Sequence, residues 1–248
     1  SLLRPDTTLV SVMAVNNEIG SIQPIHDIAA LLEDRPTISF HVDAVQALAK
    51  VATEVYLPER VDFATFSSHK FHGLRGVGFV YIKEGKKITP LLTGGGQEKE
   101  MRSTTENVAG IAATAKALRL AMENQEAFAS KTQQMKEVIR KELANYPDVT
   151  VFSGEDHFAP HILTFGIKGV RGEVVVHAFE EFDIYISTTS ACSSKAGKPA
   201  GTLIAMGVDK SIAQTAVRFS LDLENDMSQV EQFLTKFKLI YEQTRKVR

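Results

Sequence analysis

The stretch FATFSSHKFHGLRG places one lysine, Lys70, among hydroxyl and imidazole side chains at the end of an apolar run. Ser67, Ser68 and His69 precede this lysine, and His72 follows it in a turn with two glycines. Partial burial lowers the pKa of a lysine amine and makes it a nucleophile that can form a Schiff base with a carbonyl compound. An ordinary solvated loop lysine fits the same residues, so Lys70 needs support from elsewhere in the chain.

Asp43 and Gln46 supply part of that support, because HVDAVQ also ends an apolar run. A carboxylate from a neighbouring strand suits pyridoxal 5'-phosphate, since it keeps the pyridinium nitrogen protonated and the ring an electron sink. Gln46 and Asn17 could bind the ring hydroxyl of that cofactor. Ser67 and His69 could hold its phosphate oxygens. Each residue taken singly also fits an ordinary turn or cap.

A metal site is the competing interpretation of the same region. His41 and Asp43 form an H-x-D spacing, and imidazole with carboxylate suits zinc, manganese or iron. His69 and His72 form an H-x-x-H spacing, but this spacing spans a turn. We therefore favour the cofactor over a metal.

Two residues of the second half of the chain could also do chemistry. Cys192 lies in the polar stretch ISTTSACSSKAGKPAG, where Lys195 and Lys198 favour a thiolate. Arg218 lies inside the apolar run AVRFSL, and a guanidinium there could take a substrate carboxylate through two parallel hydrogen bonds. An incidental loop cysteine and a structural salt bridge are the ordinary alternatives.

The elements that must position these residues begin with three apolar runs, 9–15, 37–44 and 61–68, that are typical of buried parallel strands. A helix starting at Pro24 separates the first two runs, and a fourth strand at 76–83 is close enough to pair as a hairpin. Ligands of open parallel sheets lie beyond the carboxyl ends of the strands. Three strand ends therefore bring their polar residues to one edge.

The second half of the chain reads as a smaller α+β domain. Ser103 and Glu106 have capping-box spacing before one long helix, and Tyr146-Pro147 ends the next. The further elements that we expect are strands 149–153, 161–167, 183–187 and 217–221, a helix at 172–181 and a final helix. The expected domains are residues 1–122 and 123–248.

Composition excludes several classes of protein. The 28 Lys and Arg residues nearly balance the 30 Asp and Glu residues, so neither a nucleic-acid partner nor an anionic membrane surface is indicated. A single cysteine excludes an internal disulfide framework and fits a reducing compartment. Without a long apolar run or signal-peptide pattern, the cytoplasm is the expected location.

The motifs NNEIG, HVDAVQ, SSHK, GGGQE, RSTTEN, SAC and RFSL occur in this order, and with them the chain closely resembles the cysteine desulfurases. These are fold-type I pyridoxal-phosphate enzymes of the NifS/IscS kind in the class V aminotransferase family. The resemblance implies an α/β large domain with a mostly parallel sheet and a smaller α+β carboxyl-terminal domain. It implies conversion of L-cysteine to L-alanine, with the sulfur passing through the enzyme to an acceptor protein.

The resemblance also implies a role for each candidate residue. The cofactor-binding set consists of Lys70, Asp43, Gln46, Asn17, Ser67, His69 and Thr105, and the catalytic set of Lys70, Cys192 and His69. Thr105 would reach the cofactor phosphate of the other subunit, which implies a homodimer. Cys192 would receive the sulfur as a persulfide, and Arg218 with Asn17 would hold the substrate carboxylate. The acceptor could serve iron-sulfur cluster assembly, tRNA thiolation or thiamin.

Two features depart from the family pattern. Ser68, Thr104 and Thr189 stand where glycine is usual. The chain starts without methionine and enters an apolar run almost at once, whereas family members carry roughly a further third of the chain upstream. That upstream part includes a phosphate-binding turn and a histidine that stacks on the cofactor ring. We therefore expect a carboxyl-terminal fragment, and this chain alone could be inactive. A related lyase or aminotransferase that does not use Cys192 and a non-catalytic binding fragment are the open alternatives.

Overall fold

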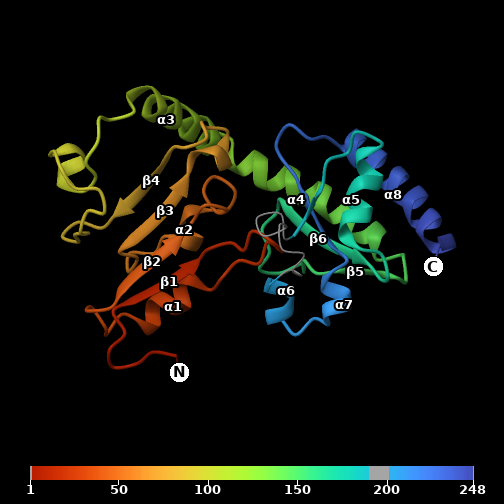
Figure 1. Cartoon of the computed structure of the whole chain (residues 1–248), viewed down its shortest axis with the longest axis horizontal. Coiled ribbons are helices and arrows are strands. Elements are labelled where there is room, and N and C mark those ends of the chain that lie inside the picture. The colour runs from red at the N-terminus through yellow and green to blue at the C-terminus, as the bar shows by residue number, and fades with distance from the viewer. Residues whose placement is uncertain (1, 190–200, 248) are drawn as a thin grey trace. The chain divides into compact units, whose positions relative to one another are not determined.

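The structure, a computed structural model, describes residues 2–189 and 201–247. The chain divides into two compact units, of which the first comprises 1–14 and 23–125 and the second comprises 15–22 and 126–248 (Figure 1). The short segment Val15–Ile22 thus groups with residues that lie far from it in the sequence. None of the helices in the described part of the chain is both long and apolar enough to cross a membrane.

The first unit is built on a four-stranded sheet with the strand order β1-β2-β3-β4. Its strands and helices are β1 (Leu9–Met13), α1 (Ile25–Leu31), β2 (Ser39–Asp43), α2 (Thr53–Tyr56), β3 (Phe63–Ser67), the 3-10 helix η1 (Ser68–Phe71), β4 (Gly78–Ile82), η2 (Gln97–Glu100) and α3 (Val108–Glu123). The first three strands are parallel, and β4 pairs antiparallel with β3. The predicted mostly parallel sheet and its hairpin are therefore confirmed.

Alternation along β2 and β3 separates an apolar face of the sheet from a polar one. Phe40 and Val42 of β2 are fully buried, as is Ala64 of β3. The residues that alternate with them along the two strands, including His41 and Asp43, are half-buried. Because successive side chains of a strand point to opposite faces, the polar residues share the face away from the apolar core.

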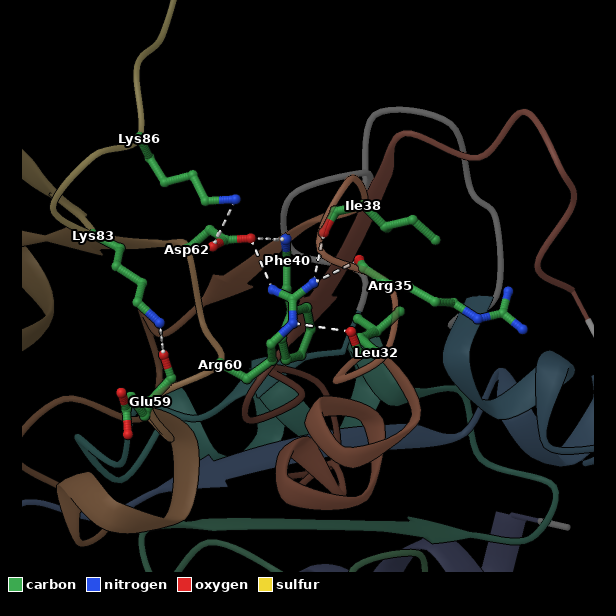
Figure 2. Close-up of polar contacts among 9 residues, drawn as sticks. All are labelled: Leu32, Arg35, Ile38, Phe40, Glu59, Arg60, Asp62, Lys83 and Lys86. Carbon is green, nitrogen blue, oxygen red and sulfur yellow. Dashed lines mark hydrogen bonds and ion pairs between the residues drawn. The ribbon is translucent and has the colours of Figure 1, made fainter.

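A buried carboxylate, Asp62, fixes the start of β3 against its neighbours (Figure 2). Its Oδ2 accepts hydrogen bonds from the Phe40 amide at 2.8 Å and from Arg60 Nη1 at 2.9 Å. Its Oδ1 lies 3.1 Å from Lys86 Nζ. Burial alone would raise the pKa of Asp62, but these donors outweigh burial, so its pKa lies below the ordinary value.

The second unit contains an antiparallel sheet with the strand order β5-β6-β8-β7. Its elements are α4 (Gln125–Leu143), β5 (Val149–Val151), β6 (Ile162–Ile167), α5 (Gly172–Glu180), β7 (Ser187–Thr188), α6 (Gly201–Ala205), α7 (Lys210–Ala213), β8 (Ala216–Ser220) and α8 (Met227–Val247). Helices α4, α5 and α8 share one core with β6 and β8, centred on Phe165, Phe233 and Phe237. The final helix that the sequence predicts is α8, and its buried side carries Val230, Phe233, Phe237 and Tyr241.

Two local expectations are wrong. The strand predicted at 183–187 is only the two-residue β7, Ser187–Thr188. The helix predicted to start with a capping box at Ser103 is capped instead by Asn107, whose side chain accepts a hydrogen bond from the Gly110 amide at 3.0 Å. Asparagine is a strong N-cap residue and lies directly before the first helical residue, so it outcompetes the more distant serine.

Candidate active site

The polar residues of the first unit lie where β2 and β3 end. Asp43 is the last residue of β2, and its Oδ1 accepts a hydrogen bond from the Val45 amide at 3.0 Å. Ser67 is the last residue of β3, and Lys70 follows in η1. Asp43 pairs in register with Thr65 of the parallel strand β3. The two strand ends therefore lie at the same edge of one sheet, as the sequence predicts.

Two buried hydroxyl groups hold η1, the short helix that contains Lys70. Ser68 Oγ lies 2.9 Å from Thr114 Oγ1 of α3, and Thr114 Oγ1 donates to the Gly110 carbonyl at 2.7 Å. Because the threonine hydrogen is used in that bond, Ser68 is the donor to Thr114. A Cβ on Gly73 would come within 1.8 Å of Ser68 Oγ, so glycine is required there. Ser68 thus anchors η1 to α3.

His41 lies on the same face as Asp43, two residues earlier on β2. Its Nδ1 lies 2.7 Å from Ser11 Oγ of β1, and its Nε2 lies 3.1 Å from Thr65 Oγ1 of β3. Burial lowers the pKa of His41, and the nearby Asp43 opposes this shift without cancelling it. Both ring nitrogens are engaged by hydroxyl groups, so neither is a ready metal ligand. In the part of the chain that the structure describes, no cluster of three His, Cys, Asp or Glu side chains could hold a metal ion.

Asn17 and Arg218 belong to the second unit and are connected directly. Arg218 Nη1 donates to the Asn17 carbonyl at 2.8 Å, which joins β8 to the NNEIG turn across 201 positions of sequence. The preceding residue, Asn16, is buried, and its Oδ1 accepts from the amides of Glu18 and Ile19 at 2.8 Å and 3.0 Å. Asn16 therefore shapes the turn, while Asn17 is half-buried.

The backbone of this turn is bound at four consecutive carbonyl oxygens. The donors, in the order of the carbonyls of Asn17, Glu18, Ile19 and Gly20, are Arg218 Nη1, Thr164 Oγ1, Ser153 Oγ and the Ala159 amide. Gly20 itself has φ +82°, and a Cβ there would lie 2.9 Å from Ile162 Cβ. The turn is therefore fixed in its conformation by the second unit.

The remaining candidate residues are less closely defined. Gln46 is half-buried in the turn after β2, and Thr105 is exposed ahead of α3. His69 is exposed in η1, next to Lys70. Cys192 lies outside the described residues.

The groups gathered in the first unit fit pyridoxal phosphate chemically. An amine, a carboxylate and a hydroxyl stand on two adjacent strand ends, in Lys70, Asp43 and Ser67, and all three are half-buried. These are the group types needed to hold an aldehyde, a pyridinium nitrogen and a phosphate. The site residues fall into two sets, one in each unit, and the set in the second unit contains Asn17 and Arg218.

Sequence reasoning missed Thr164 and Ser153. Both are buried hydroxyl residues that donate to the NNEIG turn, and they lie more than 130 positions from it in the sequence. Neither residue stands in a motif or beside a charged group in the sequence. A threonine in the apolar run HILTFGI is the only trace, and it is equally typical of any β-strand.

The sequence profile described as "Aminotransferase class-V" matches residues 1–233. A "NifS/IcsS protein homolog" from Lactobacillus delbrueckii subsp. bulgaricus is 51% identical over 246 residues, which are 99% of this chain and 64% of that protein. A "Cysteine desulfurase IscS" from Clostridium botulinum is 38% identical over 98% of this chain and 61% of its own length.

A solved structure described as a NifS-like protein superposes with a TM-score of 0.87 at 36% identity, covering 98% of this chain and 63% of that one. This similarity supports the α/β fold with a mostly parallel sheet and an antiparallel sheet. The chain spans a little over three-fifths of the length of the relatives it matches.

Proposed function

Because the chain belongs to the class-V aminotransferase family, we propose that the protein is a pyridoxal-phosphate-dependent cysteine desulfurase. It converts L-cysteine to L-alanine and transfers the sulfur to Cys192 as a persulfide, and then to an acceptor protein. The observation that carries this proposal is the joint placement of Lys70 and Asp43 at the ends of two adjacent parallel strands. The similarity to proteins named cysteine desulfurase supports the choice of substrate.

In this proposal, residues 1–122 are the carboxyl-terminal part of the cofactor-binding domain, and residues 123–248 form the small domain. Lys70 would hold the cofactor, Asp43 would keep its pyridinium nitrogen protonated, and Gln46 would bind the ring hydroxyl. Ser67 and His69 would hold the phosphate. Thr105 is exposed, as a residue that reaches the cofactor phosphate of a second subunit would be, so the proposed assembly is a homodimer.

Different residues of the chain bind the substrate and move its proton. Arg218 and Asn17 bind the carboxylate of L-cysteine, because a guanidinium can donate two parallel hydrogen bonds to a carboxylate. Lys70 moves the proton of the substrate Cα, with His69 beside it. The bound cofactor supplies an electron sink for the carbon centre.

Cys192 takes the sulfur in the next step. Its thiolate attacks the substrate sulfur, so that a sulfur-sulfur bond forms while the bond between Cβ and sulfur breaks. The carbon fragment keeps the electron pair of the broken bond, takes up a proton and leaves as alanine. The persulfide then passes its outer sulfur to an acceptor protein in the cytoplasm, for which iron-sulfur cluster assembly, tRNA thiolation and thiamin synthesis are the candidate uses.

The test compares Lys70→Ala and Cys192→Ala in the protein as its gene encodes it. We expect Lys70→Ala to abolish the borohydride-sensitive absorbance of the cofactor. Cys192→Ala should keep that absorbance and lose sulfur transfer. Lys87→Ala, which removes an exposed lysine of the same unit, is the control and should keep both. Sulfur transfer that persists in the cysteine variant would contradict the persulfide mechanism and favour a related lyase or aminotransferase.

The fraction of each relative that the chain covers favours a second candidate function for the chain taken alone. In this alternative the chain dimerises or binds a sulfur acceptor without catalysing desulfuration. The absorbance of the purified chain decides between them, because a yellow protein has assembled a cofactor site and a colourless one has not.

A further inference from the structure

Thr164 lies directly opposite Arg218 in the antiparallel register of β6 and β8. The two residues bind consecutive carbonyls of the NNEIG turn. Arg218 Nη1 donates to Asn17 O at 2.8 Å, and Thr164 Oγ1 donates to Glu18 O at 2.6 Å. This cross-strand pair therefore binds two neighbouring carbonyl groups of the turn.

The Thr164 hydroxyl is a buried donor, and the residue around it is held by a further hydrogen bond. Thr164 is fully buried, and its amide donates to Ser153 Oγ at 2.9 Å. Ser153, which follows β5, in turn donates from its Oγ to Ile19 O at 2.6 Å, so the next carbonyl of the turn is held by a residue that Thr164 itself binds. A buried carbonyl that loses its donor is costly, so removing the Thr164 hydroxyl would displace the turn around Glu18.

Such a displacement would reach the substrate-binding residues. The Glu18 carbonyl would lose its donor next to the Asn17 carbonyl, which accepts from Arg218, the residue proposed to bind the substrate carboxylate. Bidentate binding of a carboxylate requires the guanidinium plane to be fixed, and small misplacements of binding groups are costly in catalysis. We propose that Thr164 is a positioning residue that orients Asn17 and Arg218 for the carboxylate of the substrate. This inference rests on the proposed function.

Thr164→Val removes the hydroxyl and keeps the shape of the side chain, and Thr132→Val is its matched control. Thr132 is also fully buried in the second unit, but its hydroxyl donates to Phe128 O within its own helix. In the cofactor-loaded protein we expect Thr164→Val to raise the KM for L-cysteine and the inhibition constant of L-alanine roughly tenfold, which is the size of one buried hydrogen bond. The kcat should stay close to that of the unaltered protein, and Thr164→Ser should restore binding.

Three results would overturn the proposal: equal effects of Thr164→Val and Thr132→Val, a failure of Thr164→Ser to restore binding, or a loss of kcat at unchanged KM. If Thr164→Val does not fold, Ser153→Ala takes its place, with the same expected direction and a smaller rise in KM.

Failure of the proposed function is recognised separately, because the unaltered protein would then release no alanine from L-cysteine. Hydrogen exchange decides the positioning proposal in that case. The amides of Glu18 and Ile19 should exchange faster in Thr164→Val than in Thr132→Val, and equal exchange would refute it.

Discussion

Lys136 is a fully buried lysine of α4 whose side chain binds the loop that contacts the NNEIG turn. Its Nζ donates to Ala159 O at 2.9 Å and lies 5.7 Å from the centre of the Phe158 ring. Burial lowers the pKa of Lys136 from 10.5 to about 8, while Glu137 opposes this shift by a smaller amount and Arg140 adds slightly to it. This shift corresponds to about 3 kcal/mol between the two protonation states.

The sign of the pH dependence follows from proton binding. Between pH 8 and 10.5 the unfolded chain holds a proton at Lys136 that the folded chain has lost, so this group makes the protein more stable as the pH rises. The free energy of unfolding, measured by denaturant titration, should therefore increase relative to that of Lys136→Met. We expect the difference to change by about 2 kcal/mol between pH 7 and pH 9.5.

Lys131→Met is the matched control, because Lys131 lies on the same helix and also donates to a carbonyl, that of Leu223, but is only half-buried. Ordinary surface substitutions scatter by about 0.5 kcal/mol. If the difference between the unaltered protein and Lys136→Met changes by less than this over the pH range, the lowered pKa of Lys136 is refuted.

Three further predictions concern the turn, the sheet and η1. Gly20→Ala should lower the free energy of unfolding by about 1 to 3 kcal/mol, and by more than Gly76→Ala, which has a similar φ of +79° but open space around it; equal losses would exclude the steric contact. The stability contributed by Asp62 should be present above pH 3.8 and lost as the pH falls through its lowered pKa, and Asp62→Asn should remove this acid dependence. Thr114→Val should destabilise the chain more than Ser68→Ala, because it leaves the buried serine hydroxyl without an acceptor; the reverse order in denaturant titrations would show that the serine is not the donor.

The sheet edge that carries the candidate site could be predicted from the sequence alone. Apolar runs that end in polar residues predicted β1, β2 and β3, and the rule for parallel sheets predicted that Asp43 and Lys70 lie at one edge. Local composition also predicted the hairpin of β3 and β4. These features depend on patterns within a few residues, which is why they could be predicted without tertiary information.

The features that escaped prediction depend on contacts between distant residues. No local pattern shows that Val15–Ile22 groups with the second unit, or that Thr164 donates to Glu18 across 146 positions of sequence. The partners of the His41 ring are a further example, because the hydroxyl groups that engage it come from two neighbouring strands. The two-residue β7 shows that a strand pattern of five residues does not guarantee five paired residues.

The most direct test of the proposed desulfurase is a single exposure of the cofactor-loaded protein to L-cysteine, followed by mass spectrometry of the peptide that contains Cys192. The account predicts one added sulfur atom on Cys192, removable by a thiol reductant, for each alanine released. It also predicts no added sulfur and no alanine with Lys70→Ala. Alanine released without sulfur on Cys192, or sulfur added equally in the Lys70 variant, would contradict it.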